Sequence, residues 1–319
     1  MILSAQGVRA EWDGGCGHLP SLVIDGAPVL WSAPWRDDPA IAVDPDIPPV
    51  ERSLGGTFTC TPFGHDDVNN GPLHGLSANA PWRVIRAVPS ALTATRHVAH
   101  GQITARIALR DGHPVLYQTH MLDLTAPCTF AHHPMFHLAD GGRLSATPQA
   151  TLTFAAEAPF HPQNSRFDGF PDSLRDYPDA PCEDFLTLVD GPGWTALARH
   201  AEDDTILTLR RADQLPATNI WISNGARAQP PWSGVRGIIG IEDAICAGAE
   251  RFAAALDANR VTEEGVATAL LPGRHVIAHA IARIPGCHDI RSVTPGPDSL
   301  TMRTAAETIT IPFDGTHFQ

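Results

Sequence analysis

The chain has 319 residues and a formal net charge of −13, and all 22 of its basic residues are arginines. An acidic chain without a basic run is a poor partner for nucleic acid or an anionic membrane. The absence of lysine also excludes P-loop nucleotide hydrolysis and Schiff-base chemistry, because both need a lysine amine.

The six cysteines are far apart in sequence and form no CxxC pair. This spacing argues against a thiolate zinc site and against a disulfide framework. The N-terminal residues lack the features of a secretory leader, and no apolar run approaches membrane-spanning length. We therefore expect buried free thiols and a cytoplasmic protein, either a monomer or a homodimer.

Short alternating strands dominate the pattern along the chain, and long helices have little room between 27 glycines and 29 prolines. The first strong signal is a hairpin, in which Ile103–Arg110 and Pro114–Leu124 flank an Asp-Gly turn. In chain order, the further expected strands are Thr151–Ala156, Phe185–Val189, Asp204–Arg211, Asn219–Asn224, His275–Ile284 and Glu307–Phe313. Strands at this spacing predict an all-β protein, a large antiparallel sandwich formed by one domain over residues 1–319.

Three other segments depart from the strand pattern. Asp37–Val50, with four prolines, and Phe160–Cys182, rich in proline and aspartate, are expected to be surface loops. Gly248–Arg260 is expected to be a helix, although a short loop with a turn also fits. Long loops on a rigid scaffold are common places for a site.

The segment Gly71–Trp82, GPLHGLSANAPW, places His74 at a glycine-containing turn before a polar loop and an aromatic ring. Gly75 allows a tight turn or a close approach of the backbone to a ligand. Such a combination suits recognition of a polar small molecule.

The segment Ala131–Gly142 clusters His132, His133 and His137 beside Phe136. In a regular strand, His133 and His137 would share one face, and His132 would point the other way. Clustered histidines can bind a metal. They can also be polar residues of an edge strand with a purely structural role, and the sequence leaves both alternatives open.

The segment Gly237–Glu250 places Glu242 directly after the apolar run Ile238–Ile241. A buried acid needs a partner, or it acts as a base with a shifted pKa, which the neighbouring Asp243 could raise. The alternative is a charged pair that caps the following turn.

Together these segments resemble the aldose 1-epimerase (galactose mutarotase) family and its hexose-phosphate epimerase relatives. His74, Gly75, Asn79, Pro81 and Trp82 match the family string HGFARN-x-PW. Four further stretches are similar to family motifs in the same order, and the likeness spans Gly55–Ile284. Gly55–Gly64 resembles a Gly-Gly strand ending in Phe-Gly, and His133–Leu138 resembles H-P-Y-F-N-L. Gly240–Glu242 resembles G-[IL]-E-P, and Leu270–Gly273 resembles L-x-P-G.

The resemblance implies a β-supersandwich that interconverts the α and β anomers of a free monosaccharide without a metal or organic cofactor. It implies that Glu242 is the general base at the anomeric hydroxyl and that His133 is the general acid at the ring oxygen. Each such proton transfer contributes about 10²–10⁴ in rate. His74 would hydrogen-bond near C1, Asn79 would bind substrate, and Trp82 or Phe136 would pack against a sugar face. We further expect Glu242 ionised and His133 able to donate near neutral pH.

Several positions depart from the family pattern. Ala78 stands where the string HGFARN-x-PW has arginine, and Leu54 stands where the phosphate-sugar branch often has arginine. Two guanidinium groups that could bind a phosphate are therefore missing. This favours a neutral sugar, a deoxy sugar or a sugar acid over a sugar phosphate. Asp243 and His137 replace the proline and asparagine of the other two strings. The aspartate that binds a sugar hydroxyl has four candidate positions: Asp168, Asp172, Asp176 and Asp184.

Three other functions remain open at this point. The first is a non-catalytic sugar-binding or regulatory protein on the same fold, since fold does not fix function. The second is a metal-dependent sugar isomerase or lyase that uses His132, His133 and His137. The third is a carbohydrate lyase, which would have only Tyr117 and Tyr177 and no lysine for its chemistry.

Overall fold

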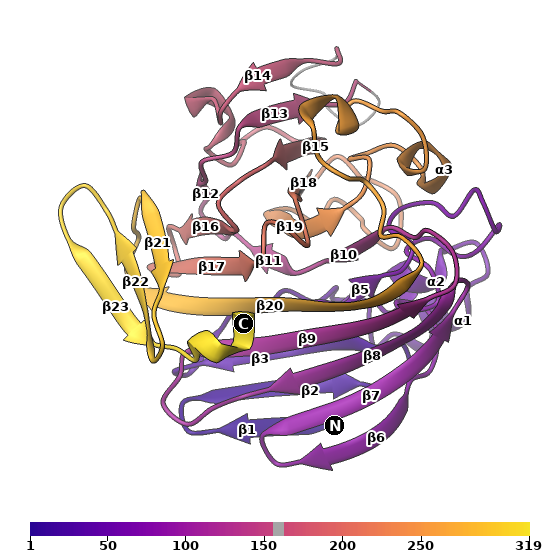
Figure 1. Cartoon of the computed structure of the whole chain (residues 1–319), viewed down its shortest axis with the longest axis horizontal. Coiled ribbons are helices and arrows are strands. Elements are labelled where there is room, and N and C mark those ends of the chain that lie inside the picture. The colour runs from indigo at the N-terminus through magenta and orange to yellow at the C-terminus, as the bar shows by residue number, and fades with distance from the viewer. Residues whose placement is uncertain (156–162) are drawn as a thin grey trace.

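A computed structural model of the chain describes residues 1–155 and 163–319. In this part of the chain the strands form four sheets, and neighbouring named strands pair antiparallel throughout (Figure 1). The all-β, antiparallel sandwich that the strand spacing predicts is therefore confirmed.

The first sheet is an N-terminal meander of four strands in sequence order, β1 to β4. Its strands are β1 (Ile2–Ala5), β2 (Val8–Asp13), β3 (His18–Ile24) and β4 (Ala27–Pro28). Burial alternates along β2, so that one face of this sheet packs on the core.

One large sheet contains the predicted hairpin and has the strand order β12-β16-β17-β20-β9-β8-β7-β6. Its strands are β6 (Arg83–Val88), β7 (Ala91–Val98), β8 (Gly101–Ala108), β9 (Val115–Leu124), β12 (Gly142–Ser145), β16 (Trp194–Arg199), β17 (Asp204–Arg210) and β20 (Gly273–Pro285). β8 and β9 pair from Gly101 opposite Leu124 to Ala108 opposite Tyr117, which confirms the hairpin.

The second large sheet, which carries the site, has the order β14-β13-β15-β18-β19-β10-β5, and β11 also pairs with β19. Its strands are β5 (Thr59–Cys60), β10 (Phe130–His132), β11 (Met135–His137), β13 (Ala150–Thr153), β14 (Arg166–Asp168), β15 (Cys182–Val189), β18 (Ala217–Asn224) and β19 (Ile238–Ile245). Every residue of β19 is buried, so the centre of this sheet is covered on both faces.

The C-terminal strands β21 (Ser292–Pro295), β22 (Ser299–Arg303) and β23 (Thr308–Pro312) form a small third layer, seen in yellow in Figure 1. Leu300, Met302 and Phe313 pack there against Tyr117 and Leu207 of the first large sheet. The predicted strand at Glu307–Phe313 is thus confirmed as β23.

A single hydrophobic cluster joins the N-terminal meander to both large sheets. It includes Leu22 of β3, Leu116 of β9, Leu197 of β16, Ile220 of β18 and Ile239 of β19. Apolar burial contributes about 25 cal/mol per Å², so a shared cluster of this extent fixes the sheets relative to one another.

The helices are few and short: α1 (Pro39–Val43), α2 (Pro49–Arg52), α3 (Phe252–Ala255) and the 3₁₀ turns η1 (Asp172–Leu174), η2 (Thr262–Glu264) and η3 (Gly315–Phe318). Among the described residues, no helix has the length and apolarity needed to cross a bilayer. The expected helix over Gly248–Arg260 is present only as the single turn α3. After it, the side-chain amide of Asn259 donates to the carbonyls of Ala254 and Asp257.

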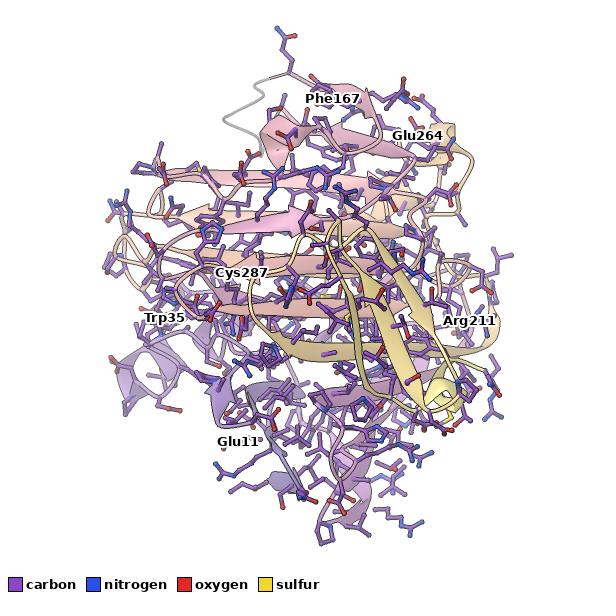
Figure 2. All side chains as sticks on the ribbon, turned by 90° about the vertical axis from the view of Figure 1, so that its left-hand side faces the viewer. Glu11, Trp35, Phe167, Arg211, Glu264 and Cys287 are labelled. Carbon is purple, nitrogen blue, oxygen red and sulfur yellow. The ribbon has the colours of Figure 1, made fainter. Side chains whose placement is uncertain are left out.

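The two expected loops also contain some regular structure. Asp37–Val50 holds α1, which Asp38 caps through the amide of Ala40, and it ends in α2. Phe160–Cys182 contains β14 and η1, and its first residues lie outside the described part of the chain, as does Ala156 of the predicted strand Thr151–Ala156. All six cysteines are free; five are buried, and Cys287 is exposed (Figure 2).

Candidate functional site

Glu242 and Asp243 are neighbours on β19 and point to opposite faces of its sheet, as strand geometry requires. Glu242 lines a cavity of about 180 Å³, and its side chain is almost fully buried. Asp243 lies on the other side, where it bonds Arg210 at 3.1 Å, Thr218 at 2.6 Å and His279 at 3.0 Å.

The expectation that Asp243 raises the pKa of Glu242 is therefore wrong. Burial raises the pKa of Glu242 to about 8, and the amide of Asn219, its cross-strand neighbour, partly offsets this. Asp243 keeps a lowered pKa despite its burial, because Arg210 and His279 stabilise its negative charge.

His133 stands at a break between β10 and β11, where Pro134 interrupts the strand. Because of this break, the three histidine side chains of the segment point to three different environments. His133 lines the cavity, whereas His132 stacks on His279 with ring centroids 4.1 Å apart, on the far side of the sheet. His137 is exposed near Trp31 and Arg199, so the expectation that it shares a face with His133 is wrong.

Because their side chains diverge, these three histidines do not converge on one point. Within residues 1–155 and 163–319, no group of three or more His, Cys, Asp or Glu side chains has the arrangement to hold a metal ion. The donor set proposed for a metal-dependent isomerase is thus not assembled in the described structure.

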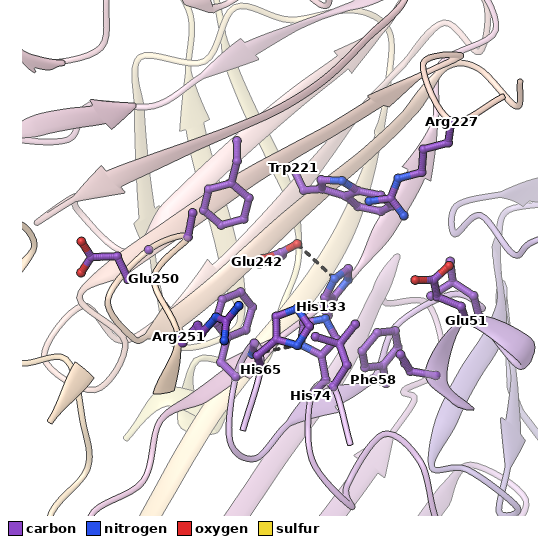
Figure 3. Close-up of a pocket in the computed structure, with 18 of the residues that line it drawn as sticks. Glu51, Phe58, His65, His74, His133, Trp221, Arg227, Glu242, Glu250 and Arg251 are labelled. Atoms are coloured by element: carbon purple, nitrogen blue, oxygen red, sulfur yellow. Dashed lines mark hydrogen bonds and ion pairs between the residues drawn. The ribbon is translucent and has the colours of Figure 1, made fainter. Parts of the chain in front are cut away.

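His133 and Glu242 form the centre of the cavity (Figure 3). His133 Nε2 lies 3.1 Å from Glu242 Oε1, and both side chains are nearly inaccessible to solvent. His133 Nδ1 and Glu242 Oε2 are buried and have no hydrogen-bond partner among the described residues. Burial lowers the pKa of His133 to about 3. In the unliganded protein, burial thus favours the neutral form of each side chain, a protonated Glu242 and an unprotonated His133.

His74 lies beside this pair, and its ring meets that of His133 edge-on at 5.2 Å between centroids. The amide of Gly64 donates to His74 Nδ1 at 3.3 Å, which leaves the ring proton on Nε2. Burial holds the pKa of His74 well below its usual range, so the ring is a neutral donor. The turn is tight: His74 has φ of 63°, and a Cβ on Gly75 would collide with the carbonyl of Thr61.

The three residues expected to contact substrate lie outside the cavity lining. Asn79 Nδ2 donates to the carbonyls of Leu73 and Gly75 at 2.7 and 2.6 Å, which fixes the turn on both sides of His74. Trp82 packs edge-on against Trp12 and donates to Ser77, and Phe136 is completely buried in the main core. These two rings are thus not available to stack on a ligand in the cavity.

The aromatic wall of the cavity comes from residues that sequence reasoning missed. Phe58 stacks on His133 with centroids 4.6 Å apart, and Trp221 meets the same histidine ring edge-on at 5.9 Å. Phe63, Phe185 and Trp232 complete the wall. Two of these residues carried a signal, because Phe58 and Phe63 lie in the Gly55–Gly64 segment.

Charged side chains close the cavity on two sides, as Figure 3 shows. Glu51 and Arg227 lie on one side of the His133–Glu242 pair, and Glu250 and Arg251 lie on the other. Of these four residues, Glu250 alone belongs to one of the segments that indicated a ligand, Gly237–Glu250.

The four aspartates considered for a sugar hydroxyl do not line this cavity. Asp168 pairs with Arg166, and Asp172 and Asp176 both pair with Arg143 on the surface. Asp184 is buried and accepts a hydrogen bond from the amide of Phe185.

No protein-family model and no curated protein matches this sequence. Solved structures do match the fold. A protein of Escherichia coli K12 provisionally named an aldose 1-epimerase superposes with a TM-score of 0.65 at 16% identity, covering 89% of this chain and 98% of its own.

Two further structures agree with this comparison. A protein of Salmonella typhimurium provisionally named a mutarotase gives a TM-score of 0.64 at 13% identity, with 89% and 90% of the two chains covered. A galactose mutarotase-like protein of Clostridium acetobutylicum gives 0.61 at 10% identity, with 89% and 94% covered. Likeness at such identities establishes architecture and leaves activity to the site. The protein therefore has the galactose mutarotase-like β-sandwich fold.

Proposed function

We propose that the protein is an aldose 1-epimerase that interconverts the anomers of a free monosaccharide by general acid–base catalysis. The observation that carries this proposal is the buried His133–Glu242 pair, 3.1 Å apart in an aromatic cavity that also receives His74. Two titratable groups whose pKa values are pushed in opposite directions are typical of an acid–base site.

The pair holds one exchangeable proton and no net charge in the unliganded protein. A sugar hydroxyl that donates to Glu242 stabilises the carboxylate form, so the proton passes to His133 as the sugar binds. Glu242 then takes the proton from the C1 hydroxyl, while His133 gives its proton to the ring oxygen and the bond between C1 and that oxygen breaks. The aldehyde turns about its C1–C2 bond, and the reverse transfers close the other anomer.

His74 stabilises the charge that develops during these transfers. Its Nε2 proton is the one that faces away from Gly64, because Nδ1 accepts the Gly64 amide. A neutral imidazole donor does not compete with His133 for the role of acid. A fixed donor aimed at developing charge contributes about 2.7–4 kcal/mol in comparable sites.

Anomer exchange measured by NMR saturation transfer, with EDTA present, tests this proposal on a panel of aldoses and sugar acids. We expect faster exchange for at least one sugar. Glu242→Gln, which keeps the shape but cannot accept the proton, is expected to abolish it, and His133→Asn is expected to reduce it severely. His137→Asn, an exposed histidine outside the cavity, is the matched control and should retain full activity.

Loss of less than about tenfold in kcat on Glu242→Gln would show that Glu242 is not the base. Saccharide binding without accelerated exchange for any sugar would instead identify a non-catalytic sugar-binding protein on this fold.

A further inference from the structure

A buried histidine outside the cavity lies directly behind its aromatic wall. His18 is the first residue of β3, and its ring stacks on Phe58 with centroids 4.4 Å apart and planes 19° from parallel. Phe58 in turn stacks on His133, at 4.6 Å and 20° (Figure 3). Each face of Phe58 has room for one stacked ring, so the two histidines occupy opposite faces. We call this arrangement the three-ring stack; it runs from the N-terminal meander to the cavity.

The ring of His18 is fixed at both of its nitrogens. Nδ1 lies 2.8 Å from the carbonyl oxygen of Ser53, and Nε2 lies 2.9 Å from that of Ala78. The guanidinium of Arg36 lies 3.4 Å from Nδ1. Burial, and after it the charge of Arg36, lowers the pKa of His18 to about 4, which favours the neutral ring. His18 therefore acts on its neighbours by packing rather than by charge.

Backbone hydrogen bonds hold the three segments of the stack together. The amide of His133 donates to the carbonyl of Phe58 at 2.9 Å. Leu19 and Thr57, which follow and precede the other stacked residues, exchange two backbone bonds of 2.8 and 3.1 Å. A Cβ on Gly56 would lie 1.7 Å from the carbonyl oxygen of Leu19, so this close approach requires glycine. The stack is thus built into the backbone and needs no ligand to form.

The orientation of His133 depends on this packing, because its hydrogen bonds do not fix the ring. Nε2 contacts Glu242 at 3.1 Å, whereas Nδ1 has no hydrogen-bond partner among the described residues. In many sites a hydrogen bond at the second nitrogen orients a functional histidine. Here His74 and Trp221 meet the ring edge-on, and Phe58 covers one of its faces. A contact at one nitrogen lets the ring plane tilt, and a stacked neighbour prevents this.

We propose that His18 is a positioning residue for His133, because it backs Phe58 and so fixes the plane in which His133 presents Nε2. This inference rests on the proposed function, which makes His133 the acid. His18 does not line the cavity, so its effect on the reaction passes through Phe58. A catalytic group misplaced by about 1 Å can lose about 10²-fold in rate.

Replacement of His18 by an amide tests this role. His18→Asn and His18→Gln keep a donor for the backbone carbonyls but remove the ring from the stack. For a sugar that the wild-type protein accelerates, we expect kcat to fall by about tenfold or more with KM unchanged. His113→Asn is the matched control. His113 also packs on an aromatic ring, that of Tyr117, and bonds its hydroxyl at 2.8 Å, but it does not line the cavity, so kcat should be normal.

A double-mutant cycle with Phe58→Leu separates an effect through Phe58 from a general loss of structure. Phe58→Leu should itself lower kcat. In that background, His18→Asn should lower kcat by less than about twofold further, because the ring on which His18 acts is already gone. An equal loss in both backgrounds, a normal kcat in both amide variants, or a change confined to KM would overturn the proposal.

Relaxation of ¹³C in the His133 ring decides the inference without an activity assay. In the wild-type protein we expect an order parameter near the rigid value of about 0.85, and a clear decrease in His18→Asn and His18→Gln. A mobile ring in the wild-type protein, below about 0.6, would overturn the proposal even if neither variant folds. A ring that stays rigid in the folded variants would also overturn it. If the wild-type protein accelerates no sugar, the proposed function fails, and these NMR outcomes still decide whether His18 positions His133.

Discussion

At the scale of single residues, burial sets the chemistry of this site. Burial is the largest influence on the pKa of both Glu242 and His133, and desolvation favours the neutral form of each side chain. Phe58 and Trp221 exclude water from the His133 ring and thereby maintain this effect. The pair is poised to move one proton rather than to hold two opposite charges.

The pH profile of kcat/KM follows from these pKa values. In the proposed mechanism the His133–Glu242 pair is active with one proton. It would lose this proton as pH rises through the raised pKa of Glu242, about 8, and would gain a second proton only near the lowered pKa of His133, about 3. Enzymatic exchange, corrected for the spontaneous reaction, should therefore be level in mildly acidic solution and fall above about pH 8. A decline between about pH 7 and pH 6, at the ordinary pKa of histidine, would contradict this assignment.

Asn79 is expected to act as a positioning residue for His74. Asn79→Ala removes two hydrogen bonds to the turn, from Nδ2 to the carbonyls of Leu73 and Gly75. We expect kcat to fall by about tenfold, as for a misplaced catalytic group, and the ¹⁵N signals of His74 to lose the pattern of a fixed Nε2–H tautomer.

Asn224→Ala is the control for this change. Asn224 also donates to backbone carbonyls, those of Pro178 and Ala180, but it does not line the cavity. A normal kcat in Asn79→Ala, or an equal loss in both variants, would show that Asn79 has no specific role at the site.

At the scale of the element, β19 carries a cavity residue and a stabilising residue at two consecutive positions. Glu242 faces the cavity, and Asp243 anchors the strand to β17, β18 and β20 through Arg210, Thr218 and His279. This anchor fixes the backbone that carries Glu242, because the two residues share one rigid strand.

Asp243→Ala should destabilise the protein by about 3–5 kcal/mol, because it leaves Arg210 buried without its partner. Urea unfolding followed by fluorescence measures this change. Asp213→Ala breaks an exposed pair with Arg211 and should cost only about 0–1 kcal/mol. Similar costs in the two variants would mean that the buried pair contributes no more than a surface one.

At the scale of the whole molecule, one continuous core joins three of the four sheets. Leu22, Leu116 and Ile220 belong to the same buried cluster although they come from different sheets. The fourth sheet, β21 to β23, packs on a separate cluster that includes Tyr117 and Phe313. The whole chain is thus expected to behave as a single domain.

Calorimetry checks this expectation. A single transition, with the calorimetric enthalpy equal to the van't Hoff enthalpy, should accompany unfolding. Two separated transitions would show that the β21–β23 layer or the N-terminal meander is an independent unit.

The sequence by itself determined the class of fold, the main hairpin and the residues at the centre of the site. The alternation of apolar and polar residues and the turn signals depend only on residues close in sequence. Short stretches of sequence were therefore enough to predict β8, β9, β17, β18 and β20. Glu242, His133 and His74 were found because each stands in a motif whose own residues are close in sequence.

Only the tertiary structure decided which side chains share a space. Trp82 and Phe136 are aromatic and near the motifs, yet they pack into the core, while Trp221 and Trp232 reach the cavity from a distant part of the chain. The break at Pro134 separates His133 from His137, and the sheet separates Glu242 from Asp243. Burial, which sets the protonation of the pair, arises from contacts among β5, β10, β18 and β19, and no local pattern encodes such long-range packing.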